Sequence, residues 1–106
     1  MVTIDSTDNI MGGWSNMTDS DEINLLAQKI TEKYISQYNK NVTLSKVLEA
    51  KQQVVAGMNY KLTLLTVDSP CDTNNQCSKK ITANVFSQPW TNTEDITILN
   101  VSNTIN

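Results

Sequence analysis

The sequence contains no histidine, and histidine is both the commonest general base and the commonest metal ligand in proteins. Its absence excludes Cys-His and Ser-His catalysis and metal binding through imidazole. Two adjacent acidic pairs remain for acid–base chemistry, Asp21/Glu22 and Glu94/Asp95, but neighbouring side chains point apart on a helix or a strand. We therefore expect no catalytic residue, no metal site and no cofactor, and we do not expect an enzyme.

Long apolar runs and clusters of basic residues are also missing. No apolar stretch approaches the ~18–20 residues needed to cross a bilayer, and residues 1–11 lack the basic start and apolar centre of a signal peptide, as in a mature chain. The eight basic residues are scattered lysines and the net charge is −3, so nothing is arranged to neutralise a nucleic-acid backbone. Neither a membrane nor a nucleic acid is an expected partner.

The length of 106 residues suits one domain, and a hydrophobic content of 39% with 18% charged residues is typical of a globular chain. Residues 1–11 are mostly polar, and Gly12-Gly13 interrupts any regular element that might follow them. We expect a flexible N-terminal segment over residues 1–11 and a single domain over residues 12–106.

Cysteine is scarce, with only Cys71 and Cys77, six residues apart in a polar, turn-rich segment. A local disulfide is easy to form there, and the alternative is two reduced thiols in a cytosolic protein. Asn16, Asn41 and Asn100 each begin an Asn-x-Ser/Thr sequon, the acceptor used in the secretory route. Together these features favour an oxidising compartment and a secreted protein.

A helical pattern begins at Asp19, which with Glu22 resembles a capping box. The spacing of the apolar residues after it predicts a helix from about 20 to 38. The residues on its apolar face are Ile23, Leu26, Ala27, Ile30, Tyr34 and Tyr38.

After a turn at residues 39–41 the apolar period falls to about two, which is typical of strands. We expect four strands, at about 42–56, 59–68, 79–88 and 95–102. In the last of them, Ile96, Ile98 and Asn100 alternate onto one face, with Leu99 opposite. A helix followed by an antiparallel meander predicts an α+β fold in which the helix covers one face of a single sheet.

The turn between the first two of these strands is unusually apolar. Val54, Val55 and Ala56 are expected at its tip, where only Gly57 is a common turn residue. Exposed valines at a tip indicate a partner that buries them. The alternative is that these residues continue a buried strand and Gly57 marks a bulge.

Two further segments combine apolar residues with turn formers. Pro89-Trp90 lies at another junction between strands, where a rigidly held tryptophan would be a strong binding anchor; the alternative is that Trp90 folds back onto the core. Ile10-Met11 leads into Gly12-Gly13, which is either a third contact or an ordinary flexible leader.

A glycine near the start, Gln53-x-Val55-x-Gly57 at mid-chain and Pro89-Trp90 near the end, in that order, resemble the cystatin family. By this resemblance Gly12 matches the family's N-terminal glycine, with Gly13 as the competing assignment. The resemblance implies a four- to five-stranded antiparallel sheet wrapped around one long helix. It also implies reversible, competitive, tight-binding inhibition of papain-like cysteine proteases such as cathepsins L, S and B.

In this family the N-terminal segment and two hairpin loops form a wedge that enters the protease's active-site cleft. The residues that the resemblance assigns to protease binding are Ile10, Met11, Gly12, Gly13, Gln53, Val54, Val55, Ala56, Gly57, Pro89 and Trp90. The alternative function is a cystatin-fold binding module without protease inhibition. A monomer is expected, and a domain-swapped dimer through the valine-rich hairpin is the other possibility.

The sequence departs from secreted vertebrate cystatins in two respects. It has two cysteines where that group typically has four, so only one disulfide of the pattern has a counterpart. The Ser-Asn-Asp motif that gives some members a second activity against legumain proteases is absent, and Asn39 and Asn41 are better explained as turn residues.

Overall fold

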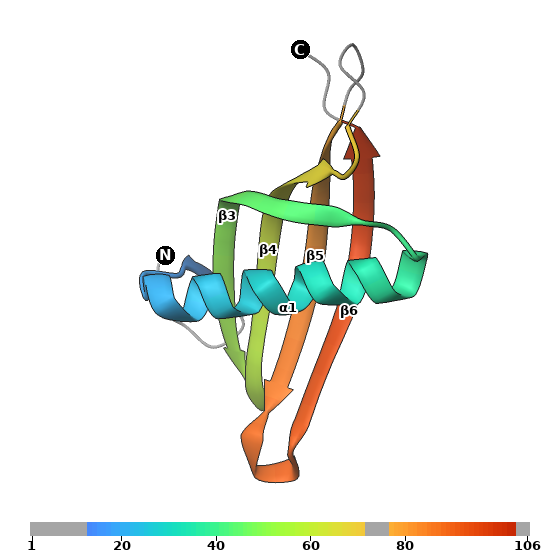
Figure 1. The fold of residues 1–106 in the computed structure, drawn as a ribbon. Coiled ribbons are helices and arrows are strands. Elements are labelled where there is room, and N and C mark those ends of the chain that lie inside the picture. Colours follow the sequence, from blue (N-terminus) through green and yellow to red (C-terminus); the bar gives the residue numbers. More distant parts are fainter. Residues whose placement is uncertain (1–12, 72–76, 104–106) are drawn as a thin grey trace.

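The computed structural model describes residues 13–71 and 77–103, in which one long helix lies across a five-stranded antiparallel sheet (Figure 1). The elements in chain order are β2 (Trp14–Asn16), α1 (Ser20–Tyr38), β3 (Val42–Val55), β4 (Gly57–Asp68), β5 (Ser78–Gln88), the 3₁₀ turn η1 (Pro89–Thr91) and β6 (Thr93–Asn103). The α+β class and the helix-then-meander order predicted from the sequence are confirmed.

The helix begins and ends where local signals predict. The Asp19 carboxylate accepts hydrogen bonds from the backbone N–H groups of Asp21 (3.0 Å) and Glu22 (3.2 Å), which satisfies two donors of the first turn. Asn39 ends the helix in the left-handed conformation, with φ 54°. These two caps mark the two ends of α1.

The strands follow one another in space in the order β2-β3-β4-β5-β6. The first of them was not predicted, because the three side chains of β2 are all exposed and carry no periodic signal. This strand exists through its pairing with residues 51–53 of β3, a contact between segments far apart in the sequence. The four longer strands match the predicted ranges to within two residues at each end.

The core lies between α1 and the face of the sheet that this helix covers (Figure 1). Side chains alternate along β4 and β5, so that every second residue is buried against the helix. The buried residues of the sheet include Val42, Tyr60, Leu62, Leu64, Thr66, Ile81, Ala83 and Val85, and those of the helix are Leu26, Ala27, Ile30, Thr31 and Tyr34. The predicted apolar face of the helix is therefore the packed one, except that Tyr38 is partly exposed.

A bulge in β6 overturns one expectation about its faces. Ile98 pairs with Ala83 but Asn100 pairs with Thr82, so Leu99 is an extra residue on this strand. The prediction that Asn100 shares a face with Ile98 is wrong, because the bulge reverses the alternation. Val101 packs against the core instead, and Asn100 is exposed.

The meander places alternate connections at opposite ends of the sheet (Figure 1). The turn from β3 to β4 and the turn from β5 to β6 lie together at the lower end in that view, while the end of β4 and the start of β5 lie at the upper end. This parity brings together two segments that are more than 30 residues apart in the chain.

Candidate functional site

The two turns at the lower end of the sheet form what we call the loop edge, residues 54–57 and 88–92. The first turn is very tight, since Val55 pairs with Gly57 and only Ala56 lies between them. The Val54 side chain is 56% exposed, and Ala56 is also exposed. The alternative that these residues continue a buried strand is therefore wrong, although Val55 is half-buried.

Gly57 allows this turn to pack closely against β5. Its φ of +118° lies in a region that side chains disfavour, and a Cβ at this position would lie 2.5 Å from the backbone oxygen of Ser87. Position 57 therefore requires glycine on two independent grounds.

Gln53 lies on the strand and not at the tip. It pairs with Asn59, whose side-chain nitrogen donates a hydrogen bond to Gln53 Oε1 at 3.0 Å. This contact joins β3 to β4 three rungs from the turn. Gln53 therefore stabilises the β3–β4 hairpin within the chain itself, whether or not it also contacts a partner.

The second turn presents a tryptophan to solvent. Pro89, Trp90 and Thr91 form one 3₁₀ turn, closed by the left-handed Asn92, whose N–H donates to the Pro89 oxygen at 3.0 Å. The Trp90 side chain is 69% exposed. The alternative that Trp90 folds back onto the core is therefore wrong.

A side-chain amide joins the two turns. Gln88 Nε2 donates a hydrogen bond to the Ala56 backbone oxygen at 2.8 Å, and Gln88 Oε1 accepts one from Thr91 Oγ1 at 2.9 Å. Sequence reasoning missed Gln88, because its partner across the turns is a backbone carbonyl and backbone acceptors leave no trace in the sequence.

The N-terminal candidates lie at the margin of the described chain. Ile10, Met11 and Gly12 lie outside the described residues, and Gly13, which is exposed, immediately precedes β2. Trp14 pairs antiparallel with Gln53, so the start of β2 points toward the β3–β4 turn. The chain thus enters the sheet beside the loop edge.

Trp14 was also missed by sequence reasoning. Its ring is partly exposed, and the Lys61 ammonium lies 5.6 Å from the ring centroid, within the range of a cation–π contact. The contact fastens the start of β2 to the sheet, because Lys61 belongs to β4.

The loop edge carries no ionisable side chain. The nearest acidic residue along β6 with a fixed partner is Glu94, whose carboxylate is 2.9 Å from Lys29 Nζ on the helix. Within residues 13–71 and 77–103, no group of three or more His, Cys, Asp or Glu side chains is placed to hold a metal ion. The chemistry available at this edge is apolar contact and hydrogen bonding.

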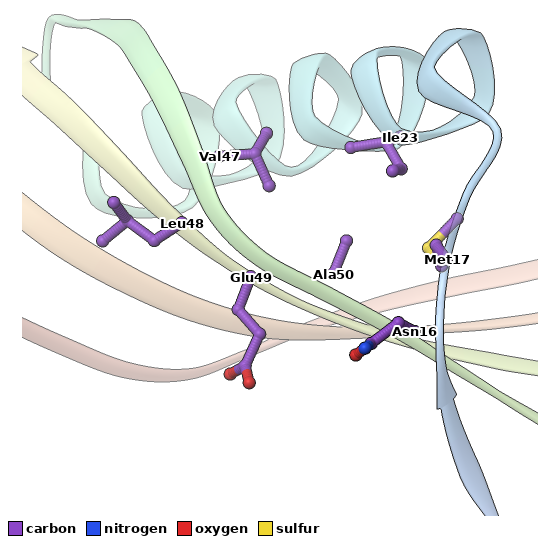
Figure 2. Close-up of a pocket in the computed structure, with 7 residues that line it drawn as sticks. All are labelled: Asn16, Met17, Ile23, Val47, Leu48, Glu49 and Ala50. Atoms are coloured by element: carbon purple, nitrogen blue, oxygen red, sulfur yellow. The ribbon is translucent and has the colours of Figure 1, made fainter.

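Two other features lie away from the loop edge. Cys71 and Cys77 are joined in a disulfide, which confirms that expectation over the reduced alternative. An open hollow of about 380 Å³ lies beside a bulge of β3 (Figure 2). Its lining residues are Asn16, Met17, Ile23, Val47, Leu48, Glu49 and Ala50. In the part of the chain that the structure describes, no helix is both long and apolar enough to span a bilayer.

Comparison with known proteins identifies this arrangement. A family model described as the cystatin domain matches residues 12–103. Cysteine proteinase inhibitor 8 of Oryza sativa subsp. japonica is 33% identical over 90 residues, which cover 83% of this chain and 69% of that protein.

Solved structures give the same result. The crystal structure of Al-CPI matches with a TM-score of 0.75 at 29% identity, covering 88% of this chain and 100% of that one. The salivary cystatin of the soft tick Ornithodoros moubata matches with a TM-score of 0.67 at 26% identity, covering 91% and 100%. The resemblance drawn from the sequence motifs is confirmed.

Proposed function

Because the chain belongs to the cystatin family, a family of inhibitors and not enzymes, we propose that it is a reversible, competitive, tight-binding inhibitor of papain-like cysteine proteases such as cathepsins L, S and B. In this proposal the loop edge and the N-terminal segment enter the active-site cleft as a wedge. Access to the catalytic cysteine is blocked without a covalent bond.

The observation that carries the proposal is the exposure of Val54 and Trp90 on two turns at the same end of the sheet, within a loop edge that has no ionisable side chain. Large exposed apolar groups at a tip are costly in water, and burial in a cleft removes that cost. A tryptophan held by a short turn loses little conformational entropy on binding and can contribute about 2 kcal/mol or more. Because both turns are braced within the free protein, little of the binding energy is spent on ordering them.

The N-terminal segment is proposed as the second half of the wedge. Ile10 and Met11 would fill apolar subsites of the protease, and Gly12 would let the backbone turn away from the attacking thiol, with Gly13 as the alternative for that role. In this proposal the segment adds contacts after the loop edge has entered the cleft. Its removal should therefore mainly raise the dissociation rate constant and change the association rate constant little. A chain lacking residues 1–11 tests this by stopped-flow measurement of both rate constants.

The proposed function is tested by titrating active papain and a cathepsin L-type protease with the purified chain and following a fluorogenic substrate. We expect activity to fall in proportion to added protein, to an equivalence point near one inhibitor per enzyme. Trp90→Ala should weaken inhibition, whereas Leu99→Ala, which removes a similarly exposed apolar side chain from β6, should not. A folded chain that inhibits neither protease would overturn the proposal and leave a binding module with another partner.

We further propose that the protein acts as a monomer in a secreted, oxidising environment. The Cys71–Cys77 disulfide and the salivary origin of one structural relative support secretion. The tight β3–β4 turn is where a domain-swapped dimer would open. Size-exclusion chromatography with light scattering distinguishes the two states, and only the monomer displays the complete loop edge.

A further inference from the structure

We propose that Gln88 is a positioning residue of the loop edge, whose side-chain amide sets the placement of the Trp90 turn relative to the β3–β4 turn. The proposal has two parts. The first, that Gln88 bridges the two turns, depends only on the contacts of Gln88. The second, that protease affinity depends on this bridge, rests on the proposed function.

The Gln88 amide uses both of its ends. Nε2 reaches across to the Ala56 oxygen at 2.8 Å, at the tip of one turn, and Oε1 lies 2.9 Å from Thr91 Oγ1, inside the other. Thr91 Oγ1 also lies 3.1 Å from the Gln88 backbone oxygen and 2.8 Å from Thr93 Oγ1. The Thr91 hydroxyl has one proton, so it donates either to Gln88 Oε1 or to the Gln88 backbone oxygen at any moment. The Thr93 hydroxyl can donate to Thr91 Oγ1.

This bridge lies just beyond the backbone ladder. The β3–β4 pairing ends at Val55 with Gly57, and the β4–β5 pairing ends at Met58 with Ser87. Among residues 13–71 and 77–103, no backbone hydrogen bond outside the strand ladders joins the two turns. In the part of the chain that the structure describes, the direct polar link between the tips is therefore the bond from Gln88 to Ala56.

The bridge requires one donor and one acceptor at the end of the same side chain, and among side chains of similar shape only the amide supplies both at neutral pH. Leucine matches the bulk but forms neither bond. Glutamate keeps the acceptor for Thr91, but in its ionised form it places a carboxylate oxygen against the Ala56 carbonyl, which repels it. When protonated, the same carboxyl group gains an O–H that can donate to that carbonyl.

The first measurement is made on the free protein, so it does not depend on inhibition. The ¹³C resonance of the Ala56 carbonyl is compared between the wild-type chain, Gln88→Leu and Gln88→Glu, with Gln37→Leu, an exposed helix position, as the matched control. We expect the Ala56 resonance to shift in both Gln88 variants at neutral pH, while the carbonyl resonances of the core residues stay unchanged in both. An unchanged resonance would overturn the bridge itself.

The second measurement is the affinity for papain. We expect Gln88→Leu to weaken binding about fivefold to tenfold, the loss typical of one neutral hydrogen bond. In a double-mutant cycle, the loss should shrink when Trp90 is already alanine, because a misplaced turn then has no anchor left to misplace. Equal losses in both backgrounds would overturn a positioning role.

The pH dependence of the papain affinity of Gln88→Glu distinguishes a positioning role from a purely structural one. Only a positioning role predicts that the affinity changes with the protonation of the new carboxyl group. Affinity is measured as a ratio to the wild-type chain from pH 7 to pH 4, across the ordinary carboxyl pKa of about 4.3. The ratio should recover toward one as the carboxyl protonates and donates to Ala56. Glu94 and Asp95, the acids nearest on β6, are present in both chains, so the ratio isolates the effect of the carboxyl group introduced at position 88.

The outcomes separate the two proposals. If the wild-type chain does not inhibit but the Ala56 resonance still responds to Gln88, the proposed function fails and the bridge stands. A second outcome is that the wild-type chain inhibits, the Gln88→Glu affinity ratio does not change with pH, and Gln88→Leu costs the same affinity with Trp90 present or absent. The function then stands and the positioning role is wrong.

Discussion

The Cα of Gly57 lies directly against the backbone carbonyl of Ser87, so close that a Cβ at position 57 would meet that oxygen at 2.5 Å. The oxygen belongs to β5 and cannot move without disturbing the rung that pairs Ser87 with Met58. The loop edge thus depends on a backbone-to-backbone approach that one methyl group would prevent.

Gly57→Ala should therefore lower the free energy of unfolding by about 2 kcal/mol or more, the sum of left-handed strain and a displaced strand end. It should also weaken protease inhibition, because the displaced turn carries Val54. Urea unfolding at constant m-value gives the first quantity and papain titration the second. Ala56→Ser, at the exposed tip next to it, is the matched control and should leave stability within about 0.5 kcal/mol. Equal stability of Gly57→Ala and Ala56→Ser would show that the turn relaxes.

Trp90→Ala should separate stability from function. Its side chain is 69% exposed, so removing it should change the free energy of unfolding by no more than about 0.5 kcal/mol. The affinity for papain should fall about 30-fold if Trp90 supplies hot-spot energy of about 2 kcal/mol. Thermal unfolding and tight-binding inhibition assays on the same sample measure both. A variant that loses stability and affinity in parallel would contradict the assignment of Trp90 to the contact surface.

The sequence predicted the elements that local signals define. Asp19 and Asn39 cap the helix through contacts within a few residues, and apolar periodicity located the four long strands. The resemblance to the cystatin family implied that the two turns lie together, and the structure places them at one end because alternate connections of a meander share an end. The remaining features depend on distant partners: β2 on its pairing with β3, the reversal at Leu99 on a bulge, and the Gln88 bridge on a backbone carbonyl.

Replacing both Cys71 and Cys77 with serine should lower stability and spare inhibition. A loop this short gives a chain-entropy contribution of about 2 kcal/mol. The disulfide lies by the end of β4 and the start of β5, at the opposite end of the sheet from the loop edge (Figure 1). A lower urea midpoint with an unchanged inhibition constant for papain is the expected result. A matching loss of inhibition would show that the two ends of the sheet are coupled.

Tyr60 joins the sheet to the start of the helix. Its hydroxyl donates a hydrogen bond to Glu22 Oε2 at 3.0 Å, and the side chain is buried. Burial, followed by the bond to Glu22 and the charges of Glu22 and Glu94, raises the pKa of Tyr60 to about 12. The folded state therefore keeps this proton at pH values where the unfolded chain, with an ordinary tyrosine pKa of about 10, has lost it.

A raised pKa contributes stability that is complete below pH 10 and is lost as the pH rises from 10 to about 12, because the unfolded state releases the proton first. Burial also raises the pKa of Tyr34, so the total alkaline loss belongs to both residues and only a difference isolates Tyr60. The free energy of unfolding of the wild-type chain minus that of Tyr60→Phe should therefore be constant from pH 7 to 9 and fall by about 2 kcal/mol between pH 10 and 12. Urea unfolding at each pH measures the difference. Parallel curves for the two chains would mean that Tyr60 titrates normally and that its bond to Glu22 does not hold the helix to the sheet.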